Sequence, residues 1–218
     1  SSDLKAVLDA AKIAAELANA SLEILPVDRT GQINQDSLRV ALSQNTGVLI
    51  AMSVNNETGS ITDVVSLAER CSASGVILIS DLTQAIGKTS IANMVPAADV
   101  SFFSGHKIYG PRGIGVLIVK RTIQKRMTKL MRGGGQERGI RGGTENLAGI
   151  ASLAVVLEKA TTFLEQDYAH YTALRNEFEA QLRSLNVRFL RTIDSANTVP
   201  NTLSIRFPGY DAEAILAN

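Results

Sequence analysis

The stretch from Ser101 to Gly115 carries the side chains best suited to chemistry. Apolar residues lead into Ser104, His106 and Lys107, and a second apolar run starts at Ile114. This pattern predicts two strands joined by a short loop that holds Lys107. Burial would lower the pKa of such an amine and make it a nucleophile for aldehydes, while the hydroxyl and imidazole supply donors for an anion. A solvated lysine at a surface hairpin is the competing interpretation.

Polar side chains also follow two earlier apolar runs. Asn56 comes after residues 47–54, and Asp81 and Gln84 come after residues 76–80. Each has an ordinary use in a turn or a cap. Parallel strands, however, place their carboxyl ends at one edge of a sheet, where ligands bind. An amine, a carboxylate and several neutral donors gathered there are the groups that an aldehyde-bearing pyridine cofactor requires.

The order of periodic segments predicts an α/β fold with a mainly parallel sheet. Continuous apolar runs are typical of buried parallel strands, and helical spacing recurs between them. We expect a helix over 3–18, a second helix that Thr62 caps, and a short strand over 22–27. The composition of the chain changes after Lys120. The basic run over 121–132 is expected to form an exposed helix face and an interface.

The second part of the chain predicts the start of another unit. The glycine-rich segment 133–144 should be ordered by a neighbour or a ligand. Two long helical patterns and two short strand candidates then follow. We therefore divide the chain into a large α/β domain over 1–145 and linking helices with part of a smaller domain over 146–218.

Composition excludes several classes of protein. With 22 basic and 21 acidic residues among 218, bulk charge gives no reason to expect nucleic-acid or membrane-surface binding. No apolar run reaches a membrane-spanning length. A single cysteine is typical of a reducing compartment, so we expect a cytoplasmic location, and no metal site is predicted.

Four motifs together identify a family resemblance. Their sequences are NNETG, SDLTQAIGK, SFFSGHKIYGPRGIG and GGGQERGIRGGT, in this order. They resemble the cysteine desulfurases, which are pyridoxal-phosphate (PLP) enzymes of the class V aminotransferase group. The resemblance implies a fold-type I homodimer that takes sulfur from L-cysteine and leaves alanine.

The same resemblance implies roles for matching residues of this chain. Lys107 would form the Schiff base with PLP and act in catalysis, with His106 beside it. Asp81 would pair with the pyridinium nitrogen, and Gln84 would bond the phenolate oxygen. Because a protonated ring withdraws electrons, this arrangement stabilises the carbanion formed when Lys107 takes the substrate α-proton.

The remaining site residues are also assigned by the resemblance. Ser104 and His106 would hold the cofactor phosphate, and Thr144 would reach the phosphate site of the partner subunit. Asn56 would lie near the substrate carboxylate and the face of the cofactor.

The chain departs from the family pattern in four places. Leu4 stands where the family usually has a histidine that stacks on the cofactor. The family's phosphate-binding threonine loop is expected before Ser1, and its nucleophilic cysteine and its substrate-carboxylate arginine after Asn218, so we expect a fragment of a longer protein. Cys71, on an apolar helical face, is expected to be a buried residue rather than the nucleophile.

Three functions remain open from the sequence. The first is a cysteine desulfurase that supplies persulfide sulfur to a protein acceptor, such as an iron–sulfur scaffold, for cluster or thiocofactor assembly. The second is a selenocysteine lyase or another class V enzyme. The third is an inactive dimeric scaffold, in which Lys107 forms no Schiff base.

Overall fold

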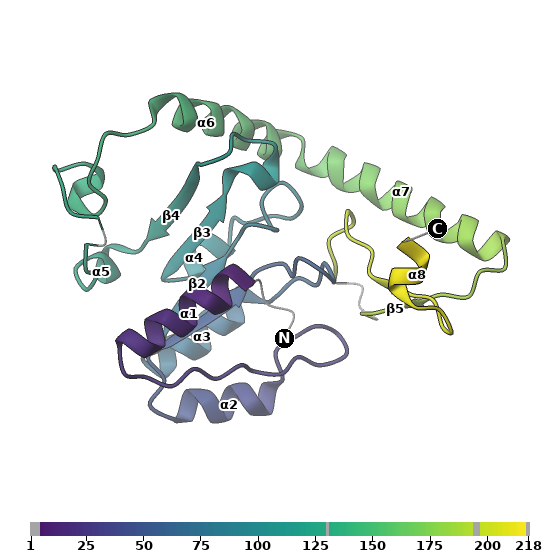
Figure 1. The fold of residues 1–218 in the computed structure, drawn as a ribbon, viewed down its shortest axis with the longest axis horizontal. Coiled ribbons are helices and arrows are strands. Elements are labelled where there is room, and N and C mark those ends of the chain that lie inside the picture. Colours follow the sequence, from purple (N-terminus) through teal and green to yellow (C-terminus); the bar gives the residue numbers. More distant parts are fainter. Residues whose placement is uncertain (1–4, 130, 194–196, 217–218) are drawn as a thin grey trace.

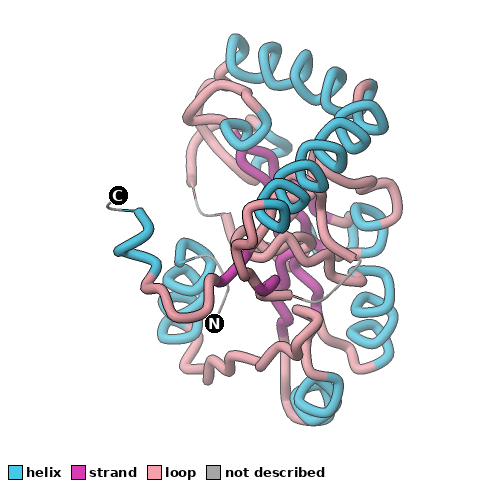
Figure 2. The backbone as a smooth tube through the Cα atoms, turned by 90° about the vertical axis from the view of Figure 1, so that its right-hand side faces the viewer, coloured by secondary structure: helices cyan, strands magenta, loops and turns pink. Residues whose placement is uncertain are grey.

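A four-stranded sheet forms the centre of the molecule. The computed structural model describes residues 5–129, 131–193 and 197–216. The strands lie in the order β1-β2-β3-β4, the first three parallel and the last antiparallel to β3. Figure 2 shows the strands at the centre with helices on either side. Their bounds are Val48–Met52, Ile77–Asp81, Val100–Ser104 and Gly115–Val119.

Eight α-helices are described around and beyond this sheet (Figure 1). In Figure 1, α6 runs along the top of the sheet and α7 extends away from it toward α8. Two 3₁₀ helices, η1 and η2, span Gly105–Ile108 and Glu137–Gly139. The α-helices are α1 (Lys5–Leu17), α2 (Gln35–Ser43), α3 (Val64–Ala73), α4 (Met94–Ala97), α5 (Arg121–Gln124), α6 (Leu147–Thr162), α7 (Leu164–Ser184) and α8 (Ala212–Leu216).

Two apolar clusters fix the sheet against its helices. The first joins α2 and α3 to β1 and β2, with Leu38, Leu78 and Cys71 almost fully buried. The second joins β3, η1 and the segment after β2 to α6, through Phe103 and Leu153 among others. Burial of this apolar surface is the main favourable contribution to folding, and the second cluster places η1 rigidly over the sheet edge.

Three expectations about local structure were wrong. Residues 22–27 form no strand; only a single bridge joins Val27 to Ile33, because Pro26 lacks an amide donor for a ladder. Helix α3 is capped by Asp63 rather than Thr62, and the Asp63 carboxylate accepts a hydrogen bond from the Ser66 amide at 3.0 Å. The basic run forms only the four-residue helix α5.

Residues 197–199 pack against the loop that follows β1. The Val199 amide donates to the Gly59 carbonyl at 2.9 Å, and the Ile61 amide donates to the Asn197 carbonyl at 3.0 Å. Gly59 has φ +73°, and a Cβ there would lie 2.9 Å from Thr202. A glycine is therefore required for this close approach.

A two-stranded antiparallel sheet lies beyond α7. It pairs β5 (Leu190–Arg191) with β6 (Ile205–Arg206). Helices α6 and α7 are bent by 66° where they meet. No single described helix is long and apolar enough to span a membrane, whereas the bent pair is, by length and composition alone. The predicted division of the chain at residues 145 and 146 falls directly before α6, and it stays a prediction.

Replacing Glu179 with alanine should lower the free energy of unfolding by about 2 kcal/mol. Its carboxylate is 3% exposed and binds Arg183 at 2.8 Å and Arg191 at 2.6 Å, which joins α7 to β5. Alanine would remove the charge-assisted hydrogen bonds to both arginines. Urea denaturation measures it, with Glu177→Ala as the matched control on the exposed side of α7. Equal stability of the two variants would contradict this role.

Candidate active site

The carboxyl ends of β1, β2 and β3 bring several polar residues to one edge of the sheet. Met52 pairs with Asp81, and Asp81 pairs with Phe102. Asn56 lies four residues beyond the end of β1, and Ser104 is the last residue of β3. The register of the parallel strands therefore brings the backbone of these residues to one edge of the sheet.

Asp81 is a buried carboxylate at the end of β2. It is 1% exposed, and its Oδ1 accepts a hydrogen bond from the Thr83 amide at 2.8 Å. It takes part in none of the ion pairs found among the described residues. A buried carboxylate without a cationic partner is costly, so this position favours a ligand that brings a positively charged nitrogen.

The loop after β1 holds a buried polar atom that has no hydrogen-bond partner among the described residues. The Asn56 Oδ1 is buried and makes no hydrogen bond within the described structure. Beside it, the Asn55 Oδ1 accepts hydrogen bonds from the amides of Glu57 at 3.0 Å and Thr58 at 2.9 Å, which fixes the turn. A buried acceptor of this kind is expected to meet a donor from a ligand or from water.

The 3₁₀ helix η1 presents His106 and Lys107 directly after β3. The Ser104 Oγ lies 2.6 Å from the His106 Nδ1, so the two donors predicted for the phosphate are in contact. The Gly105 amide donates to the Ile114 carbonyl, and the Gly110 amide donates to the Gly105 carbonyl, both at 3.0 Å. These bonds close the loop tightly and hold η1 in place.

Lys107 is exposed rather than buried. Of the two interpretations of this residue, the structure of the single chain therefore agrees with a lysine exposed at the loop. The reason is geometric: the tight turn faces Ile108 into the core, which leaves the Lys107 side chain toward solvent. The amine is thus accessible to a ligand at the same edge as Asp81.

Gln84 lies in the turn that follows β2, together with a residue that sequence reasoning left without a role. The Lys88 Nζ donates a hydrogen bond to the Gln84 Oε1. Burial lowers the pKa of the Lys88 ammonium, and the charge of Lys107 lowers it further. No periodicity in the sequence marks this pair, because a turn rather than a helix joins the two residues.

Thr144 does not join this group within one chain. It is exposed, and no described hydrogen bond links it to Ser104 or His106. The glycine-rich segment before it closes on itself, since the Gly142 amide donates to the Met131 carbonyl at 3.0 Å. Its predicted place in a partner's site stays a prediction, and Leu4 lies outside the described residues.

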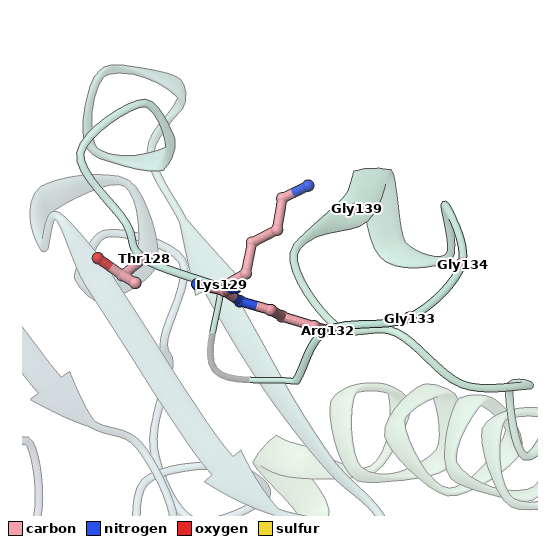
Figure 3. A pocket seen from close by; sticks show the side chains of 6 residues that line it. All are labelled: Thr128, Lys129, Arg132, Gly133, Gly134 and Gly139. Atoms are coloured by element: carbon pink, nitrogen blue, oxygen red, sulfur yellow. The ribbon is translucent and has the colours of Figure 1, made fainter.

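A surface pocket of about 390 Å³ lies between residues 128–132 and this glycine-rich segment. Figure 3 shows the Lys129 side chain extending beside the η2 turn, with Arg132 at the base of the pocket. The two cations favour an anion. The pocket contains neither Lys107 nor Asp81, so it cannot supply the chemistry outlined above. Its lining residues are Thr128, Lys129, Arg132, Gly133, Gly134 and Gly139.

The residues at the sheet edge fit PLP by the chemistry of their donors. Lys107 supplies an amine, Asp81 a buried carboxylate, and Ser104 with His106 a pair of phosphate donors. The Asn56 oxygen adds a buried acceptor without a partner among the described residues. Among the described residues, no cluster of three or more His, Cys, Asp or Glu side chains is placed to hold a metal ion.

Cys71 should be inert toward thiol reagents in the folded protein. It is 0% exposed, and burial raises the pKa of its thiol from 9.0, with Asp99 adding to the rise and Arg70 opposing it. Ellman's reagent should therefore react only as fast as the protein unfolds. Because the folded state holds this proton more tightly, the wild type should lose stability relative to Cys71→Ala as the pH rises above 9.0. Rapid labelling of the native protein would contradict this.

Comparison with known proteins shows the family to which the chain belongs. The aminotransferase class-V family profile matches residues 1–217. Cysteine desulfurase NifS of Azotobacter vinelandii is 36% identical over 192 residues, which are 88% of this chain and 47% of that protein. The chain thus spans about half the length of the curated relatives it matches.

Solved structures show the same similarity. DndA from Streptomyces lividans is 31% identical with a TM-score of 0.86, over 99% of this chain and 61% of that chain. SspA, solved in complex with cysteine, is 26% identical with a TM-score of 0.78, over 100% of this chain and 60% of that chain. The fold is that of fold-type I PLP-dependent transferases, as predicted. The chain belongs to the aminotransferase class-V family, and the relatives that it resembles include cysteine desulfurases.

Proposed function

We propose that the protein is a PLP-dependent cysteine desulfurase, which takes sulfur from L-cysteine and releases alanine. The observation that carries the proposal is the buried Asp81 carboxylate, which has no ion-pair partner among the described residues and lies at the same sheet edge as the accessible Lys107 amine. The similarity to cysteine desulfurases supports the choice of substrate, as does the cysteine bound to the related SspA.

PLP, when bound, supplies an aldehyde for covalent attachment and an electron-withdrawing ring that stabilises negative charge on the substrate α-carbon. Asp81 would stabilise a cationic ring nitrogen from its water-excluded position. Lys107, on a rigid turn, would accept the α-proton at its Nζ and later return it. Ser104 and His106 would hold the phosphate, and Gln84 would donate from its amide.

Sulfur transfer needs a thiolate that can reach the substrate. Cys71 is fully buried in the cluster between α2, α3 and the sheet, so the proposed acceptor is a cysteine other than Cys71. We further propose a homodimer in the cytoplasm that passes the sulfur to a protein acceptor such as an iron–sulfur scaffold. In such a dimer Thr144 would serve the partner's phosphate site.

The test is product analysis of the full-length protein loaded with PLP. With L-cysteine and a reductant, alanine and sulfide should form in equal amounts, and Cys71→Ala should keep this activity. Release of alanine from L-selenocysteine alone would favour a selenocysteine lyase. Formation of no alanine from either substrate would contradict the proposal and favour the scaffold interpretation.

A further inference from the structure

Lys88 and Gln84 form a fixed pair in the turn after β2. The Ile86 amide donates to the Leu82 carbonyl at 3.2 Å, and the Lys88 and Thr89 amides both donate to the Ala85 carbonyl at 3.0 Å, so backbone bonds close the turn. Gly87 has φ +71°, a left-handed conformation that ends any helical winding directly before Lys88. In this turn the Lys88 Nζ reaches the Gln84 Oε1.

This contact decides which end of the Gln84 carboxamide faces Lys88. An ammonium has three donors and no acceptor, so only the carbonyl oxygen of the amide can bind it. The Nε2 amino group, with its two donors, must therefore point away from Lys88. Without Lys88, the amide could turn over and present its oxygen in place of its donors.

The turn itself is held rigidly against the core. Ala85 is 0% exposed and Ile86 is 3% exposed. A Cβ on Gly87 would lie 3.3 Å from the Ala160 Cβ of α6, so the turn packs closely on that helix. Lys88 is thus anchored at its backbone, and its ammonium lies against the Gln84 carbonyl.

Lys88 occupies an unfavourable place for a cation. It is partly buried, and both burial and the charge of Lys107 lower its pKa. It also takes part in none of the ion pairs found in the described part of the chain. Retaining an ammonium there costs stability, which is common where a residue serves a site.

We propose that Lys88 is a positioning residue, which holds the Gln84 carboxamide so that its Nε2 group donates into the edge where Lys107 and Asp81 lie. The natural acceptor for that donor is the phenolate oxygen of PLP, so the inference rests on the proposed function. Lys88 makes no contact with the cofactor in this account and acts through Gln84 alone.

A double-mutant cycle on the full-length protein tests this. The Lys88→Met variant should bind PLP about threefold to tenfold more weakly than the wild type, because one oriented hydrogen bond is lost. Lys88→Arg, which keeps the donors, should restore the affinity. In a Gln84→Ala background, Lys88→Met should have no further effect. Lys12→Met, on the exposed side of α1, is the control.

A second measurement does not depend on the cofactor. In the apoprotein, the NH₂ signals of the Gln84 side chain should lie away from the NMR shifts of a solvated glutamine amide. Lys88→Met should move them toward those shifts, and Lys88→Arg should preserve them. Unchanged signals in Lys88→Met, or an equal loss of PLP affinity in the Gln84→Ala background, would overturn the inference. A wild type that binds no PLP would overturn the proposed function, while the amide signals would still decide whether Lys88 orients Gln84.

Discussion

Replacing Lys107 with alanine should abolish Schiff-base formation with PLP and lower desulfurase activity by about a thousandfold or more. The amine of Lys107 is exposed at the end of η1, and it is the nucleophile that the fold presents at the carboxyl edge of β1, β2 and β3. We expect this one amine to serve both as the attachment point and as the base. The visible absorption of the PLP complex, with and without borohydride, measures the loss.

The matched control is Lys129→Ala. Lys129 is also exposed, and it lines the basic pocket beside the glycine-rich segment (Figure 3). That variant should keep both the absorption band and the activity. If Lys129→Ala lost the band while Lys107→Ala kept it, the cofactor would belong in the glycine-rich pocket, and the site described at the sheet edge would be wrong.

Replacing Asp81 with asparagine should move activity and stability in opposite directions. Activity should fall about a hundredfold or more, because a neutral amide cannot stabilise a cationic ring nitrogen. The free energy of unfolding of the apoprotein should rise by about 1 kcal/mol, because a buried charge is removed. The new side chain keeps an oxygen for the Thr83 amide. Enzyme assays and urea denaturation measure the two effects.

Asp99→Asn separates this effect from a general loss of charge. Asp99 precedes β3 at the other end of the sheet, where it binds Lys120 at 3.3 Å and accepts from the Leu78 amide at 3.0 Å. This variant should leave the activity of the loaded enzyme within about twofold of the wild type and should not stabilise the apoprotein. A stabilised Asp99→Asn, or an Asp81→Asn variant with full activity, would contradict the role of Asp81.

The sequence predicts the sheet and its functional edge well for a physical reason. Continuous apolar runs around Leu78 and Phe103 leave little choice but buried strands. Polar residues that follow such runs must then lie at the strand ends, which is where Asp81 and Ser104 are found. These inferences need only local patterns and the rules of parallel sheets.

Contacts between distant segments could not be predicted in this way. The docking of Val199 on Gly59 joins residues far apart in the chain, and no periodicity marks it. Adjacent Thr62 and Asp63 are both good caps, and only the backbone path selects Asp63. The exposure of Lys107 depends on Ile108 turning into the core, which tertiary packing decides.

The most direct test of the central claim is to locate the covalent attachment of PLP. The full-length protein is incubated with PLP, reduced with borohydride, digested and mapped by mass spectrometry. We expect close to one pyridoxyl group per chain, attached to Lys107, and no comparable modification of Lys88 or Lys129. Modification of another lysine in preference to Lys107, or of none, would contradict it.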